Sequence, residues 1–227
     1  MNTIKAVIFD MDGVLTDSES VINEAAIRGL REYGINPQPA DFEPFVGMGE
    51  DHYIGGVAEA YGLRYTPEMK RRVYDIYLEI LADRLVPFPG VHELLDTLDQ
   101  AGLLIALASS ADRIKVTANL NAIDVGTERF AALVTGEDVE RKKPAPDIYL
   151  EASRQLGIPP ETCCVVEDAV SGVQAAKAAG MRCIAVTTSF GDDELLAAGA
   201  DRCRTALAGI RLSDFIGAAG PAEVETS

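Results

Sequence analysis

The chain has 227 residues, of which 48% are hydrophobic and 25% charged, a balance typical of a folded globular protein. Its formal net charge of −16 argues against binding to nucleic acid or to an anionic membrane through a basic surface. The sequence has no membrane-length apolar run, no signal-peptide pattern and no zinc-ligand spacing among its four cysteines, so we expect a cytoplasmic protein with reduced thiols.

The first predicted element is an apolar strand over residues 4–9, of the kind that is buried on both faces of a sheet. Asp10 and Asp12 follow it, with Gly13 directly after them. If the chain stays extended here, both acids point to the same side at the carboxyl edge of the sheet, where open α/β sheets place their ligands. Two acids this close repel each other unless a cation lies between them or one holds a proton. The alternative is a turn with two solvated aspartates.

Residues from about 18 to 86 are predicted to form only helices and loops. Apolar residues recur at helical spacing over 21–33, an amphipathic segment covers 51–61, and Thr66-Pro67 opens a long helix. This block interrupts the connection between the first strand and the rest of the chain. It therefore indicates an inserted helical cap.

From Gly90 onward, predicted strands and helices alternate. The strands cover 103–108, 132–135, 163–166 and 183–186, and the helices 91–101, 112–121, 147–156 and 170–179. Repeated β–helix–β units imply a parallel sheet with right-handed crossovers. We therefore predict an α/β fold, a Rossmann-like parallel sheet core (1–17 and 87–227) with an inserted all-helical cap domain (18–86).

Polar side chains follow the later strands as well. Ser109 and Ser110 follow the second strand, Lys143 lies in the loop after the third, and Glu167 and Asp168 follow the fourth. Because the carboxyl ends of parallel strands meet at one edge, these groups and the first two acids would surround one crevice. Four acids with no His or Cys nearby favour magnesium, and a lysine and a hydroxyl suit an oxyanion. Taken singly, Ser109 also suits a helix cap, Lys143 a surface position, and the acid pair a helix start.

Four motifs in this order carry a resemblance to a known family. They are Asp10-Met11-Asp12-Gly13-Val14-Leu15, Ser109, Lys143-Pro144 and Glu167-Asp168-Ala169-Val170-Ser171-Gly172. On these motifs the chain resembles the haloacid dehalogenase superfamily of phosphotransferases, and within it the β-phosphoglucomutase-like phosphatases with a small helical cap. The resemblance runs from about Lys5 to Val186.

The resemblance implies a role for each matching residue. Asp10 would be the nucleophile that becomes an aspartyl-phosphate, and Asp12 the general acid and base, whose backbone carbonyl also binds the metal. A second aspartate of this kind suits phosphate-ester chemistry, in which the leaving oxygen needs a proton. The residues implied to hold the phosphoryl group are Ser109, Ser110 and Lys143, and those implied to hold Mg²⁺ are Asp10, Asp12, Glu167 and Asp168.

The predicted cap departs from the family's mutases at two positions. Ile22 stands where they carry a histidine, and Glu50 stands where they use an arginine for the distal phosphate. An acid cannot anchor a phosphate, so both departures favour a phosphatase. Gly47 and Gly49 would let the cap loop approach Asp10, and Glu50 would prefer a neutral or cationic leaving group. The alternative is that Glu50 merely begins the next helix, where the helix dipole favours an acid.

The sequence thus predicts a phosphoric monoester hydrolase, a Mg²⁺-dependent phosphatase acting on a small phosphomonoester, foremost a sugar phosphate. The alternative is a β-phosphoglucomutase-type sugar-phosphate isomerase. A signalling receiver domain also uses an acid cluster and an aspartyl-phosphate, but that class has chains about half this length and its aspartate after the third strand. We expect a small-molecule phosphate ester as the partner, no nucleic acid or membrane, and a monomer or weak dimer.

Overall fold

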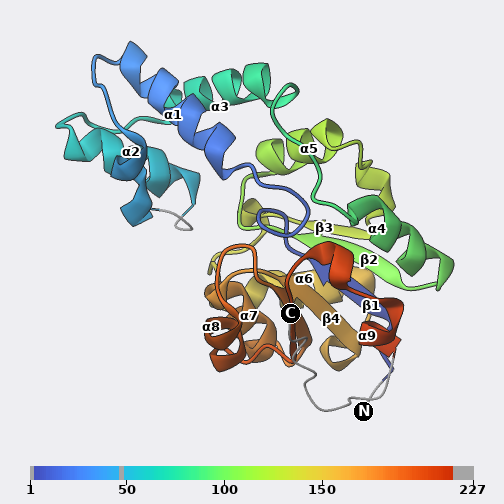
Figure 1. The fold of residues 1–227 in the computed structure, drawn as a ribbon. Helices are drawn as coiled ribbons and strands as arrows, with labels where there is room; N and C mark the ends of the chain where they lie inside the picture. Colours follow the sequence, from blue (N-terminus) through green and yellow to red (C-terminus); the bar gives the residue numbers. More distant parts are fainter. Residues whose placement is uncertain (1–2, 46–48, 217–227) are drawn as a thin grey trace.

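In a computed structural model, which describes residues 3–45 and 49–216, six parallel strands form one sheet in the order β3-β2-β1-β4-β5-β6 (Figure 1). The strands are β1 Ala6–Phe9, β2 Leu104–Ala108, β3 Ala132–Val134, β4 Cys163–Glu167, β5 Arg182–Val186 and β6 Arg202–Arg204. The order reverses at β1, and this topology opens a crevice outside the carboxyl ends of the central strands. The predicted Rossmann-like parallel sheet is confirmed.

The pairing register brings the ends of the central strands together. Phe9 of β1 pairs with Leu107 of β2 and with Val166 of β4. The Asp10 N–H continues this ladder by donating to the Val166 carbonyl at 3.0 Å. Asp10 therefore lies beside Glu167, the last residue of β4, at the carboxyl edge of the sheet.

Helices cover both faces of the sheet, which explains why its strands are apolar throughout. Val7 and Phe9 point to one face, and Ala6 and Ile8 to the other. The first face packs against α4 (Val91–Gln100), α5 (Arg113–Ala122) and α9 (Leu212–Ile216). The second face packs against α6 (Asp147–Leu156), α7 (Val170–Ala178) and α8 (Asp192–Ala197).

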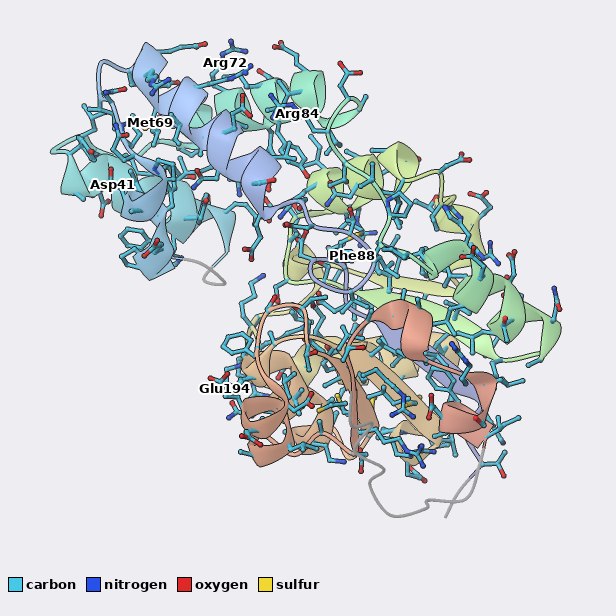
Figure 2. The ribbon with its side chains drawn as sticks, in the orientation of Figure 1. Asp41, Met69, Arg72, Arg84, Phe88 and Glu194 are labelled. Carbon is cyan, nitrogen blue, oxygen red and sulfur yellow. The ribbon has the colours of Figure 1, made fainter. Side chains whose placement is uncertain are left out.

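A helical block, defined as helices α1 to α3 with the 3₁₀ helix η1, lies apart from the sheet (Figure 1). Its elements are α1 Glu19–Glu32, η1 Pro39–Phe45, α2 Glu50–Ala60 and α3 Pro67–Leu81. Arg72 pairs with Glu32 at 2.7 Å and Arg84 with Glu24 at 2.8 Å, at the outer side of the block (Figure 2). These ion pairs tie α3 and the turn after it to α1.

The two segments that connect this block to the sheet are hydrogen-bonded to each other. The Thr16 hydroxyl donates to the Val86 carbonyl at 2.7 Å, and the Phe88 N–H donates to the Leu15 carbonyl at 2.9 Å. Phe88 lies between the helical block and the sheet (Figure 2). The helical insertion is as expected, whereas its division into domains at 18 and 86 stays a prediction.

The far end of the described chain holds elements that the sequence indicated weakly. The sequence after residue 186 predicts one or two weak helices, which correspond to the short helices α8 and α9, but it does not predict β6. Its three residues are Arg202, Cys203 and Arg204, and their side chains are half-buried at the sheet edge, so no apolar run marks the strand. Within residues 3–45 and 49–216, no helix is both long and apolar enough to cross a membrane.

Candidate active site

A cavity of about 850 Å³ lies between the carboxyl edge of the sheet and the helical block. All of the predicted core site residues line it: Asp10, Asp12, Ser109, Ser110, Lys143, Glu167 and Asp168. Gly49 and Glu50 line it from the helical block, while Gly47 lies outside the described residues. The structure thus brings the described candidates together around one cavity.

The core cluster, defined as Asp10, Lys143 and Glu167, lies at the floor of the cavity. Lys143 Nζ is 2.5 Å from Asp10 Oδ1 and 2.5 Å from Glu167 Oε1, and only 8% of the lysine side chain is exposed. The earlier alternative of a surface lysine is therefore wrong. Lys143 supplies a fixed positive charge beside the side chain predicted to attack phosphorus.

Glu167 is held in place by further donors. The Tyr149 hydroxyl donates to Oε1 at 3.0 Å, and the N–H groups of Asp168 and Ala169 both donate to Oε2 at 2.8 Å. A side chain at Gly172 would place its Cβ 1.7 Å from Glu167 Oε1, so it would displace the Glu167 carboxylate from these donors. Because its oxygens are already hydrogen-bonded, Glu167 serves to fix Lys143 in this geometry.

Asp168 follows Glu167 in the sequence, and the space for its carboxylate depends on Gly13. A Cβ at Gly13 would lie 1.8 Å from Asp168 Oδ2, and the φ of Gly13 is +77°, a value that favours glycine. The Ser189 hydroxyl donates to the same oxygen. Ser189 was not singled out from the sequence, because a serine in a loop after a strand carries no specific signal.

Burial and repulsion perturb the acids of this site. Burial raises the pKa of Asp10 to about 7, with Lys143 opposing the rise and Glu167 adding to it. Burial, followed by repulsion from Glu167 and Asp10, raises the pKa of Asp168 to about 8. Burial also opposes ionisation of Glu167, but attraction to Lys143 and the backbone donors outweighs it and lowers its pKa. One lysine therefore does not neutralise the three acids.

The donor set fits a hard divalent cation. Asp10 and Asp168 offer carboxylate oxygens, and burial followed by repulsion from neighbouring acids raises the pKa of both groups, so a bound cation would favour their ionised forms. Across the described residues, no three His, Cys, Asp or Glu side chains are arranged to hold a metal by themselves. Magnesium uses one or two carboxylates with water and substrate phosphate oxygens, so two carboxylates are sufficient.

Ser109 is buried, with 3% of its surface exposed, and its Oγ accepts a hydrogen bond from the Ala111 N–H at 3.2 Å. Because the oxygen accepts there, its hydroxyl hydrogen remains available to a group in the cavity. The residue that precedes α5 is Asp112, so the alternative of Ser109 as the helix cap is wrong. Ser110 lies beside it in the cavity wall.

The boundary cluster, defined as Asp12, Lys115 and Glu50, lies where the sheet edge meets the helical block. Lys115 Nζ is 3.0 Å from Asp12 Oδ2 and 3.9 Å from Glu50 Oε1. Asp12 Oδ1 accepts from the hydroxyl of Ser18 and, at 3.2 Å, from its N–H. Sequence reasoning missed Lys115; the signal was a lysine on the apolar face of α5, beside Val116.

Glu50 is both the first residue of α2 and part of the cavity wall, and its effect on the choice of leaving group stays a prediction. Only 8% of its surface is exposed. Burial raises its pKa, and attraction to Lys115 opposes the rise. Its Oε2 has no hydrogen-bond partner among the described residues. Gly49 before it has a φ of +86°, which a side chain would strain.

Comparison with known proteins places this site in a family context. The profile of the haloacid dehalogenase-like hydrolases matches residues 4–180. A phosphorylated carbohydrates phosphatase of Thermotoga maritima is 36% identical over 201 residues, covering 87% of this chain and 92% of that protein. The crystal structure of CbbY from Rhodobacter sphaeroides in complex with phosphate has a TM-score of 0.75 and 28% identity, covering 91% of this chain and 96% of that one.

A longer relative matches as well. The protein SUPPRESSOR OF QUENCHING 1, chloroplastic, of Arabidopsis thaliana is 43% identical over 217 residues, which are 94% of this chain. The chain spans only 21% of that protein's length. The resemblance found in the four motifs is confirmed by these matches. The relatives named as phosphatases bear out the predicted phosphoric monoester hydrolase.

Proposed function

Because the chain belongs to the haloacid dehalogenase-like hydrolase family, we propose that it is a Mg²⁺-dependent phosphatase that acts through an aspartyl-phosphate on Asp10. The observation that carries this proposal is that the core cluster and Asp12 line one cavity. The cavity thus combines a nucleophile beside a fixed cation with a second acid that can move a proton. Phosphoryl transfer needs little else from the protein beyond positioning and charge.

In the first step, an Asp10 carboxylate oxygen attacks phosphorus, and the bond between phosphorus and the ester oxygen breaks. Asp12 gives its proton to the departing oxygen, so that an alcohol leaves instead of an alkoxide. The Lys143 ammonium and the Ser109 hydroxyl stabilise the negative charge on the transferring phosphoryl oxygens. The cavity, enclosed in part by the helical block, limits the access of bulk water.

In the second step, a water molecule attacks the phosphorus of the aspartyl-phosphate, and the bond to Asp10 breaks. Asp12, now a carboxylate, takes the proton of that water and is ready to act again as an acid. Phosphate leaves and both aspartates return to their starting forms. Asp12 therefore alternates between acid and base within one turnover.

Asp10, Asp168 and the backbone carbonyl of Asp12 would hold the magnesium ion, and Glu167 would support the site by fixing Lys143. When bound, the ion supplies positive charge to the phosphoryl oxygens. The Asp12 carboxylate is committed to Ser18 and Lys115, which is why its backbone is the suitable donor. The ion would also offset the burial and the repulsion that raise the pKa values of Asp10 and Asp168.

We propose a sugar phosphate as the substrate and the helical block, 18–86, as a cap domain that closes over it. The name of the Thermotoga maritima relative supports this substrate class. Glu50 in the cavity wall favours a phosphatase over a mutase, because an acid repels a second phosphate. All four cysteines lie in the described chain and are free thiols, which suits the cytoplasm, and we retain a monomer or weak dimer as the assembly.

The test is phosphate release from a panel of phosphate esters with Mg²⁺, and in parallel with excess chelator. We expect release from small monoesters, loss of activity in chelator and recovery when Mg²⁺ is returned. Full turnover in excess chelator would contradict the metal requirement. An absence of release from every ester in the panel would contradict the phosphatase itself.

A further inference from the structure

A second buried lysine, Lys115, lies between a carboxylate of the core and one of the helical block. Its Nζ is 3.0 Å from Asp12 Oδ2 and 3.9 Å from Glu50 Oε1, and 7% of its side chain is exposed. An ammonium group this deeply buried is tolerated only when it is paired. The position of Lys115 is therefore set by both carboxylates at once.

The helix α5, which carries Lys115, contacts the helical block directly. Asp112, just before α5, pairs with Lys70 of α3 at 2.8 Å, and the Tyr77 hydroxyl of α3 donates to Asn119 Oδ1 at 2.5 Å. The contact between Lys115 and Glu50 adds α2 to this interface. Among these three contacts, the one made by Lys115 reaches the Asp12 carboxylate directly.

Both oxygens of the Asp12 carboxylate are held from this boundary. Oδ1 accepts from Ser18, the residue just before α1, and Oδ2 accepts from Lys115. A general acid acts only when it lies within hydrogen-bond reach of the leaving oxygen, and a displacement of about 1 Å costs up to about 10²-fold in rate. The groups that fix Asp12 thus decide whether it reaches that oxygen.

We propose that Lys115 is a positioning residue, which holds the Asp12 carboxylate for protonation of the leaving group and links it to Glu50 of the helical block. This inference rests on the proposed phosphatase function. Lys115 acts on the leaving-group side of the reaction, whereas Lys143 acts on the phosphoryl side. The movement of the helical block over a substrate would therefore reach the general acid through Lys115 as well as through Ser18.

The test compares two esters that differ in their need for a proton. The leaving group of para-nitrophenyl phosphate departs as a stable anion, whereas a hexose monophosphate needs its leaving oxygen protonated. We expect Lys115→Met to lower kcat for the hexose monophosphate about tenfold more than for the aryl ester. Lys115→Gln keeps a donor for Asp12 without the charge; it should shift the same ratio less, and serves if the methionine variant does not fold.

Lys70→Met is the matched control, because it removes a contact between the helical block and α5 without touching Asp12. It should leave the ratio of the two kcat values at the wild-type level. The inference is overturned if a folded Lys115 variant loses the same factor on both esters, or if Lys70→Met shifts the ratio equally. If the wild-type protein is active and Asp10→Asn is inactive, such a result rejects the role of Lys115 alone. An inactive wild-type protein rejects the proposed function and this inference with it.

Discussion

The core cluster and the boundary cluster each place one buried lysine between two carboxylates, but they are built differently. In the core cluster, Asp10 and Glu167 lie at the ends of neighbouring strands of one sheet, and Glu167 accepts hydrogen bonds from four donors. In the boundary cluster, Asp12, Lys115 and Glu50 come from the sheet edge, α5 and α2. One oxygen of Glu50 has no partner within the described part of the chain.

This difference matches the two demands of the proposed reaction. The phosphoryl group is the same in every phosphate ester, so the groups that handle it benefit from a geometry fixed by the sheet register. The leaving group differs between esters, so the groups that handle it lie where two packed bodies meet. We therefore expect the core cluster to govern the rate for all esters, and the boundary cluster to govern the choice among them.

The largest expected effect separates the two aspartates. Asp10→Asn should lower kcat by about 10⁴-fold or more for every ester, because the nucleophile is lost. Asp12→Asn should be severely impaired on alkyl esters and less so on aryl esters, because the missing role is proton donation. Phosphate-release assays on both variants, with circular dichroism to verify folding, test this. Near-native rates for Asp10→Asn in a contaminant-free sample would require another nucleophile.

The next effect separates the two lysines. Lys143→Met should lower kcat by about 10²–10³-fold, because it removes a cation aimed at the transferring phosphoryl group. The factor should be the same for para-nitrophenyl phosphate and for a hexose monophosphate, in contrast to Lys115→Met. The same pair of esters measures both variants. A leaving-group dependence in Lys143→Met would erase the distinction between the clusters.

The smallest expected effect is on thermal stability, and it distinguishes Glu50 of the boundary cluster from Glu167 of the core cluster. Burial raises the pKa of folded Glu50, so its ionised form destabilises the fold once the pH rises above the ordinary value of 4.5. Glu50→Gln should therefore raise Tm at pH 7, by about 2–4 °C per kcal/mol recovered, and the gain should vanish below about pH 4. Glu167→Gln should lower Tm, because it breaks the buried ion pair with Lys143, in which both Glu167 oxygens are hydrogen-bonded.

Thermal melts of both variants and the wild-type protein across this pH range are the measurement. Glu50→Gln should also shift the ratio of kcat/KM values toward sugar bisphosphates by up to about tenfold, since one repulsive charge is gone. Glutamine is a cleaner choice than arginine here, because a second cation would lie beside Lys115. A lower Tm for Glu50→Gln at pH 7 would show that its pairing with Lys115 outweighs its burial.

Much of this arrangement follows from local sequence patterns. The apolar runs ending in Asp10, Ser109 and Glu167 predicted both the parallel sheet and the edge where these residues meet, because strand ends fix position in such folds. Lys143 was found because a loop lysine before a proline at that edge completes the set. The half-buried strand β6 lacked any such run.

Lys115 escaped prediction for a different reason. Its partners Asp12 and Glu50 are separated from it by long stretches of chain, and its helix carries no special motif. A helical lysine is usually solvated, and its place beside Val116 on the predicted helix is a weak signal, so its burial became evident from the packing of α5 against the helical block. The support given by Ser18 and Ser189 escaped in the same way, because it depends on loop conformation.

The aspartyl-phosphate on Asp10 is the central claim, and Asp12→Ala with para-nitrophenyl phosphate tests it most directly. This ester needs no proton for its first step, whereas hydrolysis of the intermediate needs Asp12 as a base. We predict a burst of para-nitrophenolate equal to the enzyme concentration, followed by a slow phase, and one phosphoryl group located on Asp10 by peptide mass spectrometry. Release without a burst and without phosphorylated protein, or a phosphoryl group on another residue, would contradict the account.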